Sequence, residues 1–260
     1  MTKYRNIAII SSPEKTALKK KSYLIKKYNF LDGNKDIKKA NLLLVLGGDG
    51  TMLDVLHKYE NTKIPFYGIN CGTVGFLMNN PDDKKLLKAI NNAKESTLHP
   101  LKMTAISADN KKHNHLAIND ISLLRQLSQA AKIKVKVNDE ERIECLTADG
   151  ILIATAAGST AYNMSLRGPI IPFGTEILAL TPISPFRPRN WPGAILPGGA
   201  KIEFEIIDYK TRPVSATADS IEVRNVKKVI VQEDKSIKFT LLFDPNHSLE
   251  ERIIREQFIL

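Results

Sequence analysis

Short apolar runs alternate with helix-patterned segments over the first hundred residues. Residues 6–10, 41–46 and 64–69 are apolar runs that predict strands, and the run at 41–46 is typical of a strand buried on both faces of a parallel sheet. Helical spacing of apolar residues follows the first two runs, over residues 14–28 and 51–59. Because a strand, a helix and a second strand in this order form a βαβ unit, we expect an α/β domain.

The first predicted helix, residues 14–28, is amphipathic. Its apolar positions are Ala17, Leu18, Tyr23 and Leu24, and we expect them to face the core. The other face is rich in lysines that we expect to be solvated, namely Lys19, Lys20, Lys21, Lys26 and Lys27.

The hydrophobic pattern changes near residue 100. A last helical pattern before this point covers residues 82–93, and beyond it the apolar residues alternate with polar ones. Alternation of this kind predicts antiparallel strands with one packed and one solvated face. We therefore divide the chain into an α/β domain at residues 1–100, a β-rich domain at 101–237 and a tail at 238–260.

The β-rich domain is expected to contain many strands and one helix, the helix at residues 158–166. Asn138 and Asp139 supply a turn after a strictly alternating strand. The predicted strands are residues 116–124, 132–137, 142–146, 151–155, 201–207 and 229–231.

The tail is predicted to hold a strand and a terminal helix. Residues 238–243 are the strand, and Ser248 with Glu251 forms a capping-box signal ahead of a helix over residues 249–257. We expect this tail to pack back on the first domain.

The composition excludes a disordered chain, but it does not decide between several classes of partner. Of the 260 residues, 43% are hydrophobic and 25% are charged, as in folded globular chains. The net charge of +10 allows a nucleic acid, an acidic membrane surface or a polyanionic small substrate. No apolar run approaches the roughly 18 residues of a spanning helix, and Cys71 and Cys145 lack the spacing of a disulfide framework, so we expect a cytoplasmic protein.

The glycine turn Gly47-Gly48-Asp49-Gly50-Thr51 is the first candidate site. It lies between a predicted strand and a helix, where open α/β sheets bind ligands, and glycines let a phosphate approach the backbone. Asp49 is unexpected beside a phosphate, so it binds a cation, caps the helix or accepts a proton from a hydroxyl. Neither a P-loop nor a dinucleotide fingerprint fits these residues.

Polar residues in three further segments are candidates for binding. Residues 72–76 form a second glycine-rich loop that is expected at the same sheet edge, although they also fit a tight turn with Phe76 in the core. Asn119 and Asp120 interrupt an apolar strand, so they need a ligand, a hydrogen-bond network or a bulge at a sheet edge. Residues 158–165 combine hydroxyls, small residues and Tyr162, which suits a nucleoside, although Ser159 also fits a helix cap.

His113 and His115 are two positions apart and would share a face on a strand. We expect them instead in a polar loop, without a metal, because no cysteine is close to them in the sequence and Asp109 is the only nearby acid. The sequence therefore predicts no metal ligands.

Taken together, the segments at 47–51, 119–120 and 158–162 resemble the NAD kinase family. The resemblance implies an N-terminal Rossmann-like α/β domain and a C-terminal β-sandwich domain, with NAD bound between the domains, and the tail is expected to pack back on the first domain. It implies transfer of the terminal phosphate of ATP to the 2′-hydroxyl of the adenosine ribose of NAD, giving NADP, with Mg²⁺ or another divalent cation. On this likeness Asp49 is the proton acceptor.

The resemblance also assigns binding roles. Gly47, Gly48, Gly50 and Thr51 form the phosphate-donor loop. Asp149 resembles the family acid that reaches a neighbouring subunit's ligand, in a homodimer or homotetramer, although it also fits an ordinary turn residue. The residues implied in NAD binding are Asp49, Gly50, Phe76, Asn119, Asp120, Asp149, Ala157, Thr160, Ala161, Tyr162 and Ser165. The family commonly has Glu where this chain has Asp120.

Two other functions share part of this pattern. A diacylglycerol-type lipid kinase would share the glycine turn, but residues 158–165 are too polar for an apolar entry face and no amphipathic membrane helix is evident. A non-enzymatic nucleic-acid-binding protein would use the net charge of +10, but aromatic residues are only 7% and are not interleaved with the lysines. We therefore expect NAD and ATP as partners, with no nucleic acid and no membrane.

Overall fold

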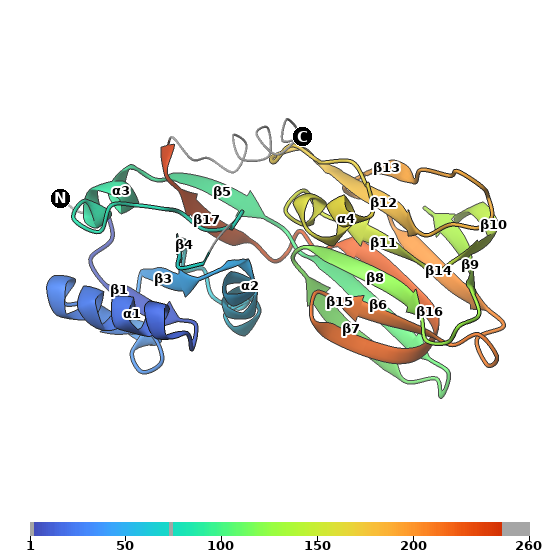
Figure 1. The fold of residues 1–260 in the computed structure, drawn as a ribbon, viewed down its shortest axis with the longest axis horizontal. Helices are drawn as coiled ribbons and strands as arrows, with labels where there is room; N and C mark the ends of the chain where they lie inside the picture. Colours follow the sequence, from blue (N-terminus) through green and yellow to red (C-terminus); the bar gives the residue numbers. More distant parts are fainter. Residues whose placement is uncertain (1–2, 73–74, 246–260) are drawn as a thin grey trace. The chain divides into compact units, whose positions relative to one another are not determined.

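The computed structural model describes residues 3–72 and 75–245 and divides into two compact units (Figure 1). Unit 1 comprises Met1–Leu98 and Ile237–Leu260, and unit 2 comprises His99–Ser236. Within the described residues, no helix has the length and apolar character needed to cross a membrane.

Unit 1 is an α/β fold built on a six-stranded sheet in the order β2-β1-β3-β4-β17-β5. Neighbouring strands are parallel except β5, which is antiparallel to β17. The strands are β1 (Ile7–Ser11), β2 (Leu31–Asp32), β3 (Leu42–Gly47), β4 (Phe66–Asn70), β5 (Lys94–Leu98) and β17 (Phe239–Phe243). All six residues of β3 are buried, as predicted for a strand covered on both faces.

The helices of unit 1 are α1 (Lys15–Tyr28), α2 (Asp49–Lys58) and α3 (Leu86–Asn92), with a 3₁₀ turn η1 at Ile37–Lys39. The third helix is shorter than predicted. Residues 82–85 form a turn instead, in which the Asp82 side chain accepts the N–H of Lys84 at 2.9 Å. Strand β5 was not predicted, because its sequence KESTL is mostly exposed and carries no apolar pattern.

The buried stripe of α1 is narrower than predicted. Ala17 and Leu24 are buried, whereas Leu18 and Tyr23 are 46% and 48% exposed. Ala17 and Leu24 are seven residues apart, so they lie on the same side of the helix. Leu18 and Tyr23 are rotated away from that side by about 100° or more, in opposite directions. The expectation that all four residues face the core was therefore wrong for two of them.

The lysine-rich face of α1 is not uniformly solvated. Lys20 pairs with Asp83 at 2.9 Å and Lys21 pairs with Asp32 at 2.8 Å, and both lysines are half-buried. Lys19, Lys26 and Lys27 are exposed, as expected. Part of the positive charge at this end of the chain is thus neutralised within unit 1.

The tail does return to the first unit, as predicted. Strand β17 lies between β4 and β5 in the sheet. Asn79 fixes it there, since its side-chain amide donates to Leu242 O at 2.9 Å and its side-chain oxygen accepts the N–H of Asp244 at 3.0 Å. The predicted capping signal at Ser248 and Glu251 and the helix at 249–257 lie outside the described residues.

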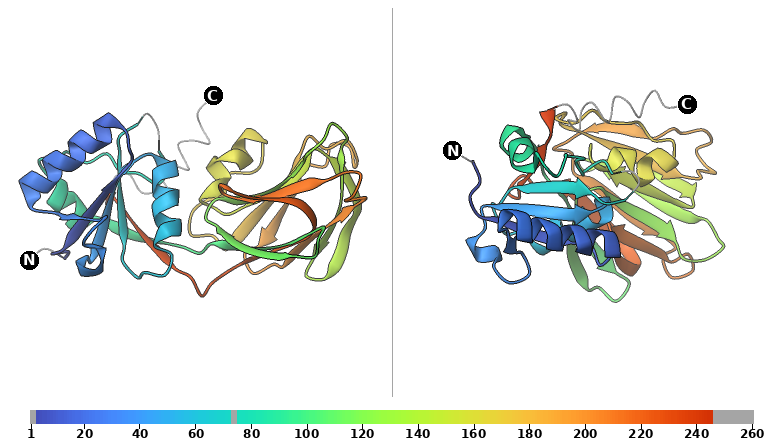
Figure 2. Two further views of the ribbon diagram at one scale, coloured as in Figure 1. Left: turned by 90° about the horizontal axis from the view of Figure 1, so that it is seen from below. Right: turned by 60° about the vertical axis from the view of Figure 1, so that its left-hand side comes forward.

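Unit 2 is antiparallel and almost entirely β (Figure 2). Its strands follow the order β10-β9-β14-β16-β15-β8-β11-β12-β13, with β6 paired to both β16 and β7. The strands are β6 (Leu101–Ser107), β7 (Lys112–Ala117), β8 (Asp120–Arg125), β9 (Ala131–Val137), β10 (Glu140–Ala148), β11 (Gly150–Ala154), β12 (Ile177–Ile183), β13 (Ala194–Pro197), β14 (Ile202–Ile207), β15 (Val214–Ala218) and β16 (Ile221–Glu233).

Strand β16 organises this unit, because it pairs with β6, β14 and β15 along its 13 residues. The sequence predicted only residues 229–231 of it, since charged residues interrupt the alternation towards its start. The predicted strand at 116–124 is in fact two strands, β7 and β8, with a corner at residues 118–119. The predicted helix at 158–166 is a 3₁₀ turn η2 (Gly158–Thr160) and a short helix α4 (Tyr162–Ser165).

Candidate functional site

Asp49 is held at the carboxyl end of β3, where α2 begins. The helix is capped by Gly48 without a side-chain hydrogen bond, so the helix-cap interpretation of Asp49 was wrong. Its carboxylate instead accepts the backbone N–H groups of Phe76 at 2.8 Å and Leu77 at 2.9 Å. These bonds orient both carboxylate oxygens.

The described residues of the two glycine-rich loops lie at one sheet edge, as predicted. Strands β3 and β4 are parallel neighbours, and their last residues Gly47 and Asn70 are paired. The loop after β4 returns to Asp49 through its N–H groups. A carboxylate and two loops are thereby brought together within unit 1.

The glycines of the turn differ in what they permit. A Cβ on Gly47 would lie 2.4 Å from the hydroxyl of Thr51, so packing within the turn requires glycine there. A Cβ on Gly48 or Gly50 would have no atom of the described residues within 4 Å. The backbone at these two positions is therefore open to an approaching group, as phosphate binding requires.

Asn119 and Asp120 lie in unit 2 where β7 gives way to β8, with Asn119 in the corner between the strands and Asp120 as the first residue of β8. The corner is held by Asp219, whose carboxylate accepts the N–H groups of Ile118, Asn119 and Asp120 at 2.7, 3.0 and 3.2 Å. Sequence reasoning missed Asp219, for which the only local signal is an ordinary Asp-Ser turn. The bulge interpretation of this corner was wrong.

The side chains of Asn119 and Asp120 are in energetically unfavourable environments. The side-chain oxygen of Asn119 is buried and has no hydrogen-bond partner among the described residues. Burial, with a further contribution from the negative charge of Asp219, raises the pKa of Asp120 to about 7. Buried polar groups that lack partners are costly, and a ligand that pairs with them removes that cost.

The segment 158–165 has one face fixed in the core of unit 2. The Ser159 hydroxyl donates to Ala156 O at 2.8 Å and accepts the N–H of Ile171 at 3.0 Å, so it does not cap a helix. The buried Asn163 accepts a hydrogen bond from the Thr181 hydroxyl at 2.6 Å and donates to Pro169 O at 2.9 Å.

The predicted base-binding residues divide by exposure. Tyr162 and Ser165 are exposed and Ala161 is half-buried, which leaves them available to a ligand. Ala157 and Thr160 are 6% and 8% exposed.

Two of the predicted motifs pack against each other in unit 2. A Cβ on Gly158 would lie 2.0 Å from the backbone oxygen of Asn119, so only glycine fits there. The Thr155 hydroxyl donates to Ile118 O at 2.7 Å and accepts the N–H of Gly158 at 3.1 Å. The corner at 118–120 and the turn at 158–160 are thus one assembly.

Asp149 lies between β10 and β11, where it is half-buried. Its carboxylate pairs with the guanidinium of Arg125 at 2.5 Å. Asp149 is thus held by its own chain, and the structure places it at the far end of β11 from residues 155–160.

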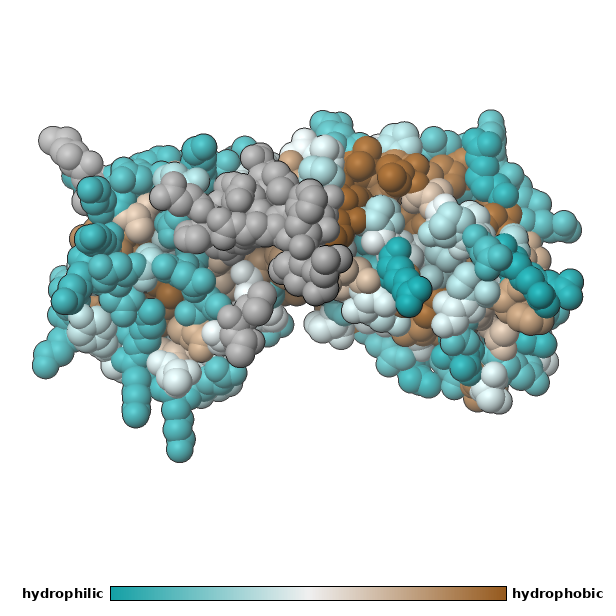
Figure 3. Space-filling model, turned by 45° about the horizontal axis from the view of Figure 1, so that its top comes forward, coloured by the Kyte–Doolittle hydropathy of each residue, from teal (hydrophilic) through white to brown (hydrophobic). Residues whose placement is uncertain are grey.

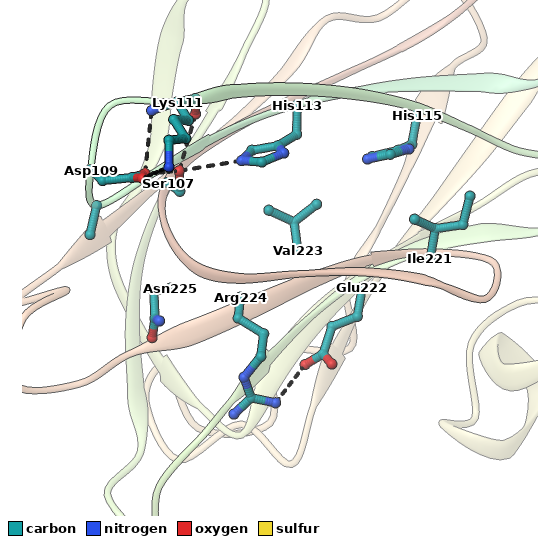
Figure 4. Close-up of a pocket in the computed structure, with 11 residues that line it drawn as sticks. Ser107, Asp109, Lys111, His113, His115, Ile221, Glu222, Val223, Arg224 and Asn225 are labelled. Atoms are coloured by element: carbon teal, nitrogen blue, oxygen red, sulfur yellow. Dashed lines mark hydrogen bonds and ion pairs between the residues drawn. The ribbon is translucent and has the colours of Figure 1, made fainter.

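The two histidines lie on strand β7 rather than in a loop, which corrects the prediction for His113 and His115. They project from the same face of the strand above Val223 and Ile221 of β16 (Figure 4). They line a hollow of about 620 Å³ together with the turn after β6. In the part of the chain that the structure describes, no cluster of three or more His, Cys, Asp or Glu residues could hold a metal ion.

Comparison with known proteins identifies the family of this chain. The sequence profile of the ATP-NAD kinase N-terminal domain matches residues 10–95, and that of the ATP-NAD kinase C-terminal domain matches residues 118–238. The chain belongs to the ATP-NAD kinase family. The resemblance noted in the sequence is confirmed.

Relatives in this family match nearly the whole chain. The NAD kinase of Rickettsia bellii (strain OSU 85-389) is 51% identical over 225 residues, which is 86% of this chain and 88% of that protein. The NAD kinase of Xylella fastidiosa (strain 9a5c) is 47% identical over 258 residues, 99% of this chain and 98% of that protein. Neither the lipid kinase nor the nucleic-acid-binding alternative is supported by these ATP-NAD kinase matches.

Two solved structures share the fold of this chain. Yeast NADH kinase complexed with NADH matches with a TM-score of 0.82 at 23% identity, over 97% of this chain and 86% of that one. An NAD kinase from Archaeoglobus fulgidus in complex with ATP matches with a TM-score of 0.77 at 22% identity, over 97% of this chain and 98% of that one. The predicted combination of an α/β domain and a C-terminal β domain is confirmed.

Proposed function

We propose that this member of the ATP-NAD kinase family transfers the terminal phosphate of ATP to the 2′-hydroxyl of the adenosine ribose of NAD, giving NADP. The observation that carries the proposal is the match to a curated NAD kinase over 99% of this chain at 47% identity. Asp49 is the proton acceptor in this proposal.

The environment of Asp49 supports this role. Phosphoryl transfer depends mainly on alignment and charge stabilisation, so the base must be placed rather than strong. Two backbone N–H groups, of Phe76 and Leu77, fix the carboxylate at the sheet edge. In the proposed reaction, Asp49 orients the ribose hydroxyl and takes its proton as the new P–O bond forms and the bond to the leaving phosphate oxygen breaks.

The NAD contacts that we propose are those of the family motifs. In unit 2, Asn119 and Asp120 would hydrogen-bond to the nucleosides, and Tyr162 would stack on a base. The side-chain oxygen of Asn119, which has no hydrogen-bond partner among the described residues, supports this assignment. The full proposed set is Asp49, Gly50, Phe76, Asn119, Asp120, Asp149, Ala157, Thr160, Ala161, Tyr162 and Ser165.

The donor phosphates would approach the turn formed by Gly47, Gly48, Gly50 and Thr51, where the backbone at Gly48 and Gly50 is open. Mg²⁺ is usually held by one or two carboxylates and by the substrate phosphates rather than by a protein cage. We therefore propose that the cation enters the site with ATP. When bound, it would neutralise charge on the phosphates.

We also propose a homodimer or homotetramer, in which Asp149 reaches the ligand of a neighbouring subunit. Figure 3 shows hydrophobic residues gathered on the visible face of unit 2. Among the exposed hydrophobic side chains of this unit, Phe186 and Ile195 are 56% and 58% exposed. Association would remove such side chains from water.

Light scattering on the purified protein tests the assembly. The expected mass is two or four times the 29.0 kDa of the chain. Replacing Ile195 by Asp should lower it, because a charge at an apolar interface is costly. A fully active protein of 29.0 kDa would contradict the proposal.

A cytoplasmic location is the corresponding proposal for the cell. Both cysteines, Cys71 and Cys145, are free, which suits a reducing compartment.

The activity itself is tested by incubating the protein with ATP, Mg²⁺ and NAD and then assaying NADP with an NADP-specific dehydrogenase. Parallel reactions with NADH as acceptor and with polyphosphate as donor define the substrates. NADP formation is the expected result. Absence of product with either donor, together with phosphate incorporation into diacylglycerol or a salt-sensitive shift of duplex DNA, would favour a rejected alternative.

A further inference from the structure

We propose that Asp219 is a positioning residue for the dinucleotide: its carboxylate fixes the backbone of residues 118–120 so that the Asn119 and Asp120 side chains are presented to NAD. The inference rests on the proposed function, since it concerns the same NAD site. Asp219 lies in none of the three motifs that identify the family resemblance.

The contacts of Asp219 reach three consecutive residues. One carboxylate oxygen accepts the N–H of Ile118 at 2.7 Å, and the other accepts those of Asn119 and Asp120 at 3.0 and 3.2 Å. In return, the backbone N–H of Asp219 donates to Asp120 O at 3.1 Å. Four hydrogen bonds thus join two segments that are about 100 residues apart in the chain.

The topology explains why a carboxylate is needed. At residues 118–119 the chain leaves β7 and enters β8, and successive N–H groups at such a corner lack the partners of a regular ladder. Asp219 follows β15 in a left-handed conformation, with φ of 49°, next to the pairing of Ala218 with Ile121. An asparagine there would replace one accepting oxygen by an NH₂ group that faces backbone donors.

The corner is fixed from the opposite side as well. Asn119 O accepts the N–H of Thr155 at 2.9 Å, and the close approach of Gly158 leaves no room for this oxygen to move. The backbone of Asn119 is therefore held between Asp219 and the 155–158 turn, while its side-chain oxygen has no partner among the described residues. A rigid backbone with an unsatisfied side chain is the arrangement expected of a preorganised binding group.

The charge of Asp219 adds a measurable signature. On β11, Ala154 is paired with Asp120, and on β15, Ala218 is paired with the adjacent Ile121. Neither alanine titrates. After burial, the negative charge of Asp219 is the further cause that raises the pKa of Asp120. Removing that charge should lower the pKa of Asp120, although burial would still keep it above the ordinary value.

The test is Asp219→Asn, with Asp219→Glu as the charge-conserving variant. We expect the Asn variant to raise KM for NAD about 10- to 100-fold, the effect of losing hydrogen bonds to a charged group. KM for ATP should stay within about two-fold and kcat should change much less than KM for NAD. The pH midpoint of KM for NAD should move to lower pH in the Asn variant, and the Glu variant should restore the wild-type midpoint.

Asp208→Asn is the matched control, because Asp208 is also an aspartate with positive φ, in a turn of unit 2, but its carboxylate pairs with Lys132. It should behave as the wild type. Circular dichroism and NAD binding by calorimetry accompany the kinetics of every variant. An Asn variant whose KM for NAD and pH midpoint match the wild type would overturn the inference. It would also be overturned by an Asn variant that is unfolded and in which kcat falls and both KM values rise to the same extent.

The experiments give different results when the proposed function is wrong and when the role of Asp219 is wrong. A wild-type protein that binds NAD but forms no NADP would contradict the kinase activity, and calorimetry would still decide the role of Asp219 from the NAD affinity of the Asn variant. A wild-type protein that neither binds NAD nor forms NADP would overturn both proposals.

Discussion

Replacing Asp49 by Asn is expected to lower kcat for NADP formation by about 100- to 10,000-fold, the range for loss of a general base. The amide cannot take the ribose proton. It also replaces one of the oxygens that accept the N–H groups of Phe76 and Leu77, so the loop after β4 loses part of its anchor. Steady-state kinetics with saturating ATP and NAD measures the effect.

Asp54→Asn is the control for this substitution, since Asp54 lies on the same helix, is exposed and loses the same charge. It should retain kcat within about two-fold, as expected of exposed sites. The thermal midpoints of both variants show whether the fold is intact. A kcat for Asp49→Asn within a few-fold of wild type would remove Asp49 from the role of proton acceptor.

Replacing Gly158 by Ala is expected to have the second largest effect, with a loss of about 3 kcal/mol in the free energy of unfolding. The new Cβ would lie 2.0 Å from Asn119 O, which is a backbone atom held on both sides and cannot move cheaply. The clash falls on the corner that presents Asn119 and Asp120. NAD affinity should therefore fall as well, by more than the change in KM for ATP.

Gly199→Ala provides the comparison for this variant. A Cβ on Gly199 would have no described atom within 4 Å, so the substitution adds the same methyl group without a clash. Its unfolding midpoint in urea should match that of the wild type. Equal midpoints for the Gly158 and Gly199 variants would show that the 118–120 corner yields to the methyl group.

The fold could be predicted from the sequence where buried positions form a regular local pattern of apolar residues. The apolar run that forms β3 and the strict alternation that forms β9 are examples. Strand β5 was missed because its KESTL sequence is mostly exposed. The corner between β7 and β8 was missed because the apolar pattern continues through Ile118 while the chain changes direction.

The site was predictable only as far as its motifs extend. The resemblance supplied Asp49 and Asn119 as candidates, and the structure shows what holds each of them. Asp49 binds N–H groups 27 and 28 residues away, and Asp219 binds N–H groups 99 to 101 residues away. Spacing within a motif contains no information on partners at such separations, so hydrogen bonds between distant segments need the folded chain.

The position of β17 has a consequence for synthesis on the ribosome. Unit 2 is a continuous stretch, His99–Ser236, whereas the sheet of unit 1 needs a strand that is translated after it. Since domains fold as units from the N-terminal end during translation, unit 2 can complete its sheet while the nascent unit 1 still has a gap between β4 and β5. The part of the chain that is made first is thus the last to be finished.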